Sequence, residues 1–167
     1  MTAPVFVDTN VFVYARDARD APKQRRAMAW LEFLWREQAG RTSAQVLSEY
    51  FVTVTRKLAQ PMEPDAAWDD VRALFAWQPR AIDPEVLTCG VEVARRFRLS
   101  WWDSLVVAAA QLQSCPLLLS EDLQDGLVIG GVTVRSPVTI GVHEAPAPYR
   151  ARRVVRGRGP REASSPA

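Results

Sequence analysis

The stretch that decides the fold is Val5-Phe6-Val7-Asp8-Thr9-Asn10, in which a short β-branched and aromatic run ends at an acid. Such a run predicts a buried strand over residues 5–7. Open α/β sheets place their ligands at the carboxyl ends of parallel strands, so Asp8 is a candidate site residue. An Asp directly after a strand can equally be only the N-cap of the next helix.

Beyond this strand, segments with helical spacing alternate with short apolar runs. Amphipathic helices are predicted over residues 22–38, 43–60, 65–75 and 84–98. A helix buried on most sides is predicted over residues 102–113, which are apolar almost all round. Further strands are predicted at residues 81–82, 117–119 and 132–134, with Gly130-Gly131 as the turn between the last pair. Strands separated by helices imply crossover connections, so the fold class is α/β with a mainly parallel sheet.

Charge is divided unevenly along the 167 residues. Residues 1–149 hold 15 of the 21 Lys and Arg residues and 18 of the 19 Asp and Glu residues, a net charge of −3. Residues 150–167 hold six arginines against one glutamate, a net charge of +5. A hydrophobic fraction of 48% excludes a disordered or collagen-like chain. We expect one domain over residues 1–142 and a flexible Arg/Pro-rich tail over residues 143–167.

The two cysteines exclude a disulfide scaffold and a structural zinc site, because neither has a second cysteine at CxxC spacing. Cys89 and Cys115 lie in apolar stretches and are predicted to be small core residues in a reducing compartment. The first residues lack the positive region of a signal peptide, and no apolar stretch has the length of a membrane span. The sequence therefore predicts a cytoplasmic protein that does not enter a membrane.

Asp103 stands on an otherwise apolar face of the helix predicted over residues 102–113. A carboxylate buried there must be neutral, paired with a cation or bound to a metal. No Lys or Arg occurs between Arg98 and Arg135, so a local salt bridge is excluded, although a distant arginine could supply one.

Two other acids become candidate site residues when they are considered together with Asp8 and Asp103. Asp122 follows the predicted strand 117–119 closely, which is also typical of a turn or an N-cap, and Glu49 alone resembles a surface charge. Several carboxylates brought together raise each other's pKa unless a divalent cation binds them. Oxygen ligands without histidine or thiolate favour Mg²⁺ or Mn²⁺, ions that polarise a phosphodiester and activate water. No Walker lysine motif and no GxSxG motif is present, which excludes P-loop and serine-hydrolase chemistry.

Four short pieces occur in a set order: residues 5–10, Ser43 through Glu49-Tyr50-Phe51, Ser100-Trp101-Trp102-Asp103-Ser104, and Leu118-Leu119-Ser120-Glu121-Asp122-Leu123. In this order they resemble the PIN-domain endoribonucleases, most closely the VapC toxins of bacterial toxin–antitoxin pairs. The resemblance covers residues 1 to about 140. It implies a three-layer α/β/α fold with an acidic pocket that binds Mg²⁺ or Mn²⁺.

The resemblance also implies roles for individual residues. The metal-binding and catalytic acids of the family are matched by Asp8, Glu49, Asp103 and Asp122. The polar or acidic residues that support such a pocket are matched by Asn10, Ser43 and Asp125, and Ser120 replaces the more usual Thr before the fourth acid. The implied activity is metal-dependent hydrolysis of RNA by a toxin that pairs with a cognate antitoxin protein and forms a homodimer.

Two other functions remain open from the sequence. A catalytically silent PIN-like module would only bind a protein partner, and the tryptophan-rich helices between Trp30 and Trp77 offer a docking surface unless they pack in the core. A phosphatase with Asp8 as nucleophile would need a second Asp two positions on, where Asn10 stands. For a nuclease, the acidic body leaves RNA contact to cations such as Arg16, Arg19, Arg25, Arg26 and the tail arginines.

Overall fold

The computed structural model describes residues 1–148, which form a five-stranded sheet of order β2-β1-β3-β5-β4. The strands are β1 (Val5–Val7), β2 (Gly40–Arg41), β3 (Leu117–Leu119), β4 (Val128–Ile129) and β5 (Val132–Arg135). β1 runs parallel to β2 and β3, and β3 runs parallel to β5. Only β4, at one edge, is antiparallel to its neighbour. The mainly parallel sheet expected from the sequence is confirmed.

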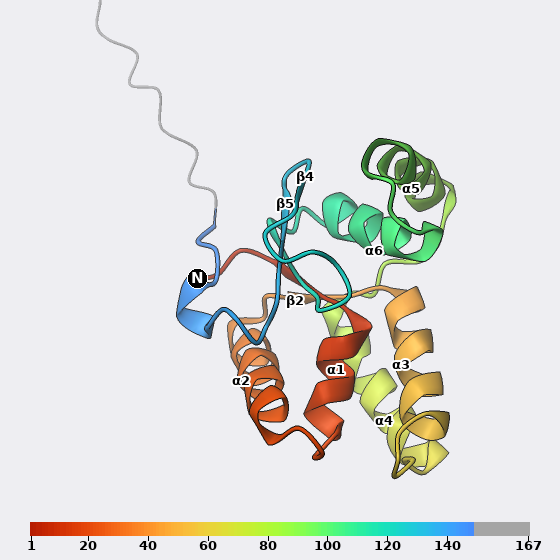
Figure 1. Ribbon diagram of the computed structural model, residues 1–167, viewed down its shortest axis with the longest axis vertical. Coiled ribbons are helices and arrows are strands. Elements are labelled where there is room, and N and C mark those ends of the chain that lie inside the picture. The colour runs from red at the N-terminus through yellow and green to blue at the C-terminus, as the bar shows by residue number, and fades with distance from the viewer. Residues whose placement is uncertain (149–167) are drawn as a thin grey trace, which may run out of the picture.

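Helices fill the connections between the parallel strands. They are α1 (Thr9–Arg16), α2 (Ala21–Glu37), α3 (Ala44–Arg56), α4 (Pro64–Ala73), α5 (Pro84–Phe97) and α6 (Trp101–Leu112), with short 3₁₀ turns η1 (Leu74–Trp77) and η2 (Val142–Glu144). Figure 1 shows α1 beside α2 and α3 beside α4 in one part of the molecule, with α5 and α6 paired in another. This arrangement agrees with the three-layer α/β/α fold that the resemblance implies.

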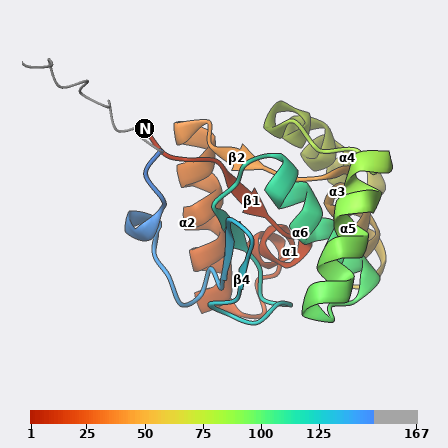
Figure 2. The same ribbon diagram turned by 90° about the horizontal axis from the view of Figure 1, so that it is seen from above.

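Helix α6 is the most deeply buried helix of the fold. Every residue from 104 to 110 is buried, so no polar face is left along its middle. Figure 2 shows α6 between the strands and α5, and it contacts β3, β5 and α5. The helix predicted to be apolar on all sides therefore lies where both of its faces meet protein.

Two predictions of local structure are wrong, and one strand, β2, was not predicted. Residues 81–82 form no strand, because Ile82 is 44% exposed and the sheet pairing falls on β2 instead. Gly130-Gly131 does not join β3 to β5 but closes the hairpin between β4 and β5, with Gly130 at φ +59°. β2 consists of Gly40 and Arg41 and has no β-branched residue that would have predicted it, since its partner strand β1 determines it.

The close approach of Gly40 to Trp77 gives the first prediction. A Cβ at Gly40 would come within 2.5 Å of three indole ring atoms of Trp77, which is only 3% exposed. We expect Gly40→Ala to lower the free energy of unfolding by about 1–3 kcal/mol, because the ring must move within a packed core. Urea unfolding measures this. Gly131→Ala is the matched control, since nothing lies within 4 Å of its added Cβ, and equal losses in both variants would contradict the prediction.

The packed chain continues past the boundary predicted at residue 142. The Ala3 N–H donates to the Pro146 carbonyl at 2.8 Å, and the Gly141 N–H donates to the Glu144 carboxylate at 2.8 Å. Pro146 is therefore hydrogen-bonded to the N-terminal segment, and Glu144 closes a local turn with Gly141. The predicted tail otherwise falls at residues 149–167, outside the described residues. Within residues 1–148, no helix is both long enough and apolar enough to cross a membrane.

Candidate active site

The parallel pairing of β1 with β3 brings two of the predicted acids to one edge of the sheet. Val7 is the register partner of Leu119, and the Asp8 N–H donates to the Leu119 carbonyl at 3.0 Å. Asp8 and Ser120 are thus the first residues beyond two adjacent strands. Their meeting is a direct consequence of parallel topology, in which carboxyl ends share an edge.

Asp8 is a buried carboxylate, 4% exposed. Its Oδ1 accepts the Thr9 N–H at 2.8 Å at the start of α1, and its Oδ2 accepts the Ser120 hydroxyl at 2.7 Å. Burial raises the pKa of Asp8 from 3.8 to about 7, although the bonds from Ser120 and Thr9 lower it. The nearby charges of Asp122 and Glu49 add to the rise in this pKa. Asp8 is therefore a helix N-cap, and its carboxylate is also repelled by the charges of Asp122 and Glu49.

Glu49 projects from α3 and is held at both carboxylate oxygens. Thr9 Oγ1 donates to Glu49 Oε2 at 3.0 Å, and Gln45 Nε2 donates to Glu49 Oε1 at 3.0 Å. The same Gln45 amide group also donates to the Trp102 carbonyl at 3.2 Å. Gln45 thereby joins α3 to the first turn of α6 and orients Glu49 toward α1.

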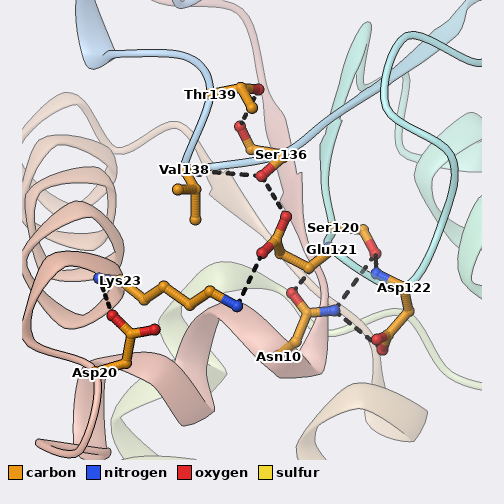
Figure 3. Close-up of polar contacts among 9 residues, drawn as sticks. All are labelled: Asn10, Asp20, Lys23, Ser120, Glu121, Asp122, Ser136, Val138 and Thr139. Atoms are coloured by element: carbon orange, nitrogen blue, oxygen red, sulfur yellow. Dashed lines mark hydrogen bonds and ion pairs between the residues drawn. The ribbon is translucent and has the colours of Figure 1, made fainter.

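Asp122 is positioned by Asn10, as Figure 3 shows. Asn10 Nδ2 donates to Asp122 Oδ2 at 3.1 Å and to Ser120 Oγ at 3.4 Å, while Asn10 Oδ1 accepts the Glu121 N–H at 3.2 Å. The side chain of Asn10 therefore ties α1 to the loop after β3. Because an amide has no titratable proton, Asn10 cannot serve as the general acid that an Asp-nucleophile phosphatase needs.

Glu121 ties the loop that carries Asp122 to two other segments (Figure 3). Its carboxylate accepts the Ser136 hydroxyl and lies 3.4 Å from Lys23 Nζ of α2. The ammonium of Lys23 also lies 4.9 Å from the centre of the Tyr14 ring. Glu121 lies between Ser120 and Asp122, so these contacts fix the backbone of both neighbours. The position of Asp122 is therefore set before any ligand binds.

Asp103 lies in the first turn of α6, where its N–H donates to the Ser100 hydroxyl at 3.2 Å. It is half-buried rather than enclosed, contrary to the apolar face predicted for it, because the first turn of α6 lies near the surface. Within residues 1–148 no arginine or lysine forms an ion pair with it, so the alternative of a distant cation finds no support there. Its place in the chain, directly after the Trp102 carbonyl that Gln45 binds, puts it at the helix end facing α3.

Two residues predicted to support the pocket have other structural roles. Ser43 caps α3, because its Oγ accepts the Val46 N–H at 3.2 Å, and so it acts on Glu49 only by starting the helix. Asp125 binds the Ser136 N–H at 2.9 Å and Arg135 Nε at 3.0 Å. The bond from Ser136, with Arg135 beside it, holds the pKa of Asp125 below its ordinary value. Asp125 does not line the pocket described next and instead fastens the chain after β5.

The pocket at this edge of the sheet has a volume of about 600 Å³. Its polar lining residues are Thr9, Asn10, Tyr14, Ser48, Glu49, Thr53, Lys57 and Asp122. Lys57 places one positive charge at a site otherwise dominated by acids. We name this cavity the carboxylate pocket; its size is within the range of small-molecule and substrate sites.

The donor set of the carboxylate pocket fits a hard divalent cation in its chemistry. Glu49 and Asp122 in the lining, and Asp8 beside it, supply only oxygen, and no histidine or cysteine lines the pocket, which matches the ligands of Mg²⁺ or Mn²⁺. Within residues 1–148, the structure contains no group of three or more Asp, Glu, His or Cys side chains close enough together to hold a metal ion. Burial is the main cause of the raised pKa of Asp8, and the charges of Asp122 and Glu49 add to it, so a cation bound here would relieve that repulsion.

Sequence reasoning missed Thr9 and Gln45, the two donors that hold Glu49. Thr9 follows Asp8 directly, and the spacing of Gln45 and Glu49 is the i, i+4 spacing that brings side chains together on a helix. That spacing is the one signal in the sequence that would have found Gln45.

Comparisons with known proteins bear on the family and the fold of the chain. A family model described as the PIN domain matches residues 5–124. No curated protein sequence matches the chain. One similar solved structure is a toxin–antitoxin complex from Klebsiella pneumoniae, with a TM-score of 0.56 and 20% identity over 81% of this chain and 98% of that chain.

Two further solved structures share the fold at low identity. VapC20 of Mycobacterium tuberculosis, described as a toxin that cleaves the sarcin–ricin loop, gives a TM-score of 0.55 and 20% identity over 71% of this chain and 91% of that chain. VapBC2 of Rickettsia felis, bound to a DNA fragment from its promoter, gives a TM-score of 0.56 and 14% identity over 79% and 97%. At these identities the likeness concerns the fold.

Proposed function

The chain belongs to the PIN-domain family, and from this membership we propose that it is a metal-dependent endoribonuclease, the toxin of a toxin–antitoxin pair. The observation that carries the proposal is that Glu49 and Asp122 line one pocket and that their charges add to the raised pKa of the buried Asp8 beside it, which is about 7. Burying a carboxylate beside other acids lowers the stability of a protein. Such an arrangement is therefore expected where the acids have a function, such as binding a cation.

The proposed ligands of the ion are Asp8, Glu49, Asp103 and Asp122. When bound, Mg²⁺ or Mn²⁺ supplies a Lewis acid that polarises the phosphodiester and lowers the pKa of water. Ser120 and Thr9 orient the Asp8 carboxylate, and Asn10 orients that of Asp122. Thr9 and Gln45 fix Glu49 on the opposite wall, where it can accept a proton from an attacking water.

Some of the cations expected to bind the RNA backbone form ion pairs within the protein, and others do not. Arg16 pairs with Asp70 and Arg19 with Asp17, so neither is free to neutralise phosphate. Lys57 in the pocket lining and the exposed Arg25 and Arg26 of α2 remain available. We propose that Lys57 contacts the RNA phosphate nearest the acids.

An antitoxin partner and a homodimer are also proposed. The support is the kind of protein that shares the fold, since one of the similar structures is a toxin–antitoxin complex. Copurification of this chain with the protein encoded beside it, and sedimentation of the purified chain alone, test the two assemblies separately.

The test of the proposed function is cleavage of total bacterial RNA by the purified protein, with Mg²⁺ or Mn²⁺ and with EDTA. We expect cutting that requires the ion and is lost in Asp103→Asn. A covalent aspartyl-phosphate intermediate would favour the phosphatase instead. A folded protein that cuts no RNA under any of these conditions would leave the silent binding module as the function.

Gln45→Ala tests whether the orientation of Glu49 matters. The substitution removes the only donor to Glu49 Oε1 within the described residues, so that Glu49 is held by Thr9 Oγ1 alone. We expect the Mn²⁺ concentration for half-maximal cleavage to rise about tenfold, the usual effect of losing a residue that orients a metal ligand. Gln24→Ala removes a similar side-chain bond, to the Ala15 carbonyl of α1, and should leave that concentration unchanged. Equal behaviour of the two variants would show that Thr9 alone suffices.

A further inference from the structure

A second pocket opens beside Glu49, between α3 and the start of α6. It has a volume of about 480 Å³ and is lined by Ala44, Gln45, Ser48, Glu49, Ala81, Ile82 and Trp102. We call it the Trp102 pocket. We propose that it binds one unpaired nucleobase of the RNA substrate, next to the phosphate that is cleaved. The inference rests on the proposed ribonuclease function and names the substrate class as RNA with an unpaired nucleotide at that position.

The exposure of Trp102 is the first argument. It is 58% exposed, the highest value among the six tryptophans, whereas Trp30 and Trp77 are buried in the core. The exposed Trp35 rests on the Trp77 ring at 5.2 Å, but no aromatic ring within residues 1–148 packs on Trp102. An indole with a free face costs solvation unless a ligand covers it, and unpaired bases stack on such rings whatever their sequence.

Continuity with the carboxylate pocket is the second argument. Ser48 and Glu49 line both pockets, so a group in the Trp102 pocket lies directly beside the proposed site of hydrolysis. The carboxylate pocket holds Glu49 and Asp122, which suit a cation, and Lys57, which suits a phosphate. The Trp102 pocket contributes Ile82 and the indole ring, with Gln45 and Ser48 as polar groups at the edge of a base. Phosphate and base are adjacent in every nucleotide, and so are the two pockets.

Positive charge lies on the far side of the Trp102 pocket. Ala81 also lines a polar cleft of about 500 Å³ that contains Arg41 and Arg80. Arg80 is paired with Asp83 and Glu85, while Arg41 forms no ion pair within the described residues. The acids would lie at the cleaved phosphate, the Trp102 ring at the base, and Arg41 at the next phosphate along the strand. The order of these groups on the protein therefore matches their order in the RNA. A protein partner would not require this order of charges.

The binding experiment uses the Asp8→Asn protein, which keeps the RNA intact. Fluorescence anisotropy with labelled single-stranded hexanucleotides of A, U or C in Mg²⁺ measures the affinity. We expect Trp102→Ala in this background to weaken binding roughly tenfold and Trp102→Phe to restore most of it. Trp35→Ala is the matched control for an exposed tryptophan and should not change the affinity. Equal affinities with and without Trp102, or no binding of any hexanucleotide, would overturn the proposal.

The cleavage experiment locates the base. An RNA that the wild-type protein cuts is prepared with a single abasic nucleotide at each position beside the cut. At the position whose base occupies the pocket, the abasic RNA should be cut roughly tenfold more slowly by the wild type, with no further loss in Trp102→Ala. Additive losses at every position would contradict the inference while leaving the nuclease itself established. A Trp102→Ala variant that binds RNA normally but turns a dimer into a monomer would instead show a protein interface.

Discussion

Asp8→Asn should reduce RNA cleavage by roughly a hundredfold or more while leaving the fold intact. Asp8 is a buried acid beside the carboxylate pocket, close enough to Asp122 and Glu49 for their charges to raise its pKa, and its charge is what an ion bound there would neutralise. Asparagine keeps an oxygen that can accept the Thr9 N–H, so α1 retains its N-cap. The substitution therefore removes the charge with little change in local structure.

The measurement is the initial rate of cleavage of one RNA at saturating Mg²⁺, with circular dichroism to confirm the fold. Asp69→Asn is the matched control, because Asp69 is an exposed acid of α4 whose partner is Arg72. We expect the control to cleave at the wild-type rate. Cleavage by Asp8→Asn within a few-fold of the wild type would mean that the reaction occurs elsewhere on the molecule or comes from a contaminant.

The pairing of Asp8 with the loop that carries Asp122 could be predicted from the sequence, because both follow short apolar runs and parallel strands end at one edge. The orientation of Glu49 could not. Glu49 is exposed on its own helix, and its position depends on Thr9 of α1 and on a glutamine that also binds the Trp102 carbonyl of α6. Contacts between elements distant in sequence are set by packing, which helix periodicity does not describe.

The same reason explains the residues whose roles differ from those expected. Asp125 matches a supporting acid of the family, yet β5 returns the chain so that Arg135 Nε and the Ser136 N–H both donate to Asp125 Oδ1. β2 was not predicted because Gly40 and Arg41 have no strand preference of their own and pair only because β1 lies beside them. Residues 81–82 were predicted as a strand because they are apolar. They form none, because Ile82 is exposed and a strand in this sheet is stabilised by burial.

The contribution of Asp8 to the stability of the metal-free protein should fall as the pH rises from about 4 to about 7. The pKa of Asp8 is raised from 3.8 to about 7 in the folded state, mainly by burial, so over this interval the folded protein binds more protons than the unfolded chain. The slope of the unfolding free energy with pH is then negative. The contribution of Asp8 is fully retained below about pH 4 and is lost as the pH passes about 7, a change of roughly 4 kcal/mol.

Urea unfolding of the wild type and of Asp8→Asn in EDTA, between pH 4 and 8, isolates this contribution, because all other titrating groups are shared. We expect Asp8→Asn to gain stability relative to the wild type across the interval and to be the more stable protein at pH 8. Mg²⁺ should then reverse the order at pH 8, since an ion that binds only the folded wild type stabilises it by about 2.7 kcal/mol at a hundred times its dissociation constant. Parallel stability curves in EDTA would contradict the raised pKa of Asp8. A reversal of order would identify this carboxylate as a group whose burial is unfavourable without a cation and favourable with one, as expected of a metal ligand rather than a helix cap alone.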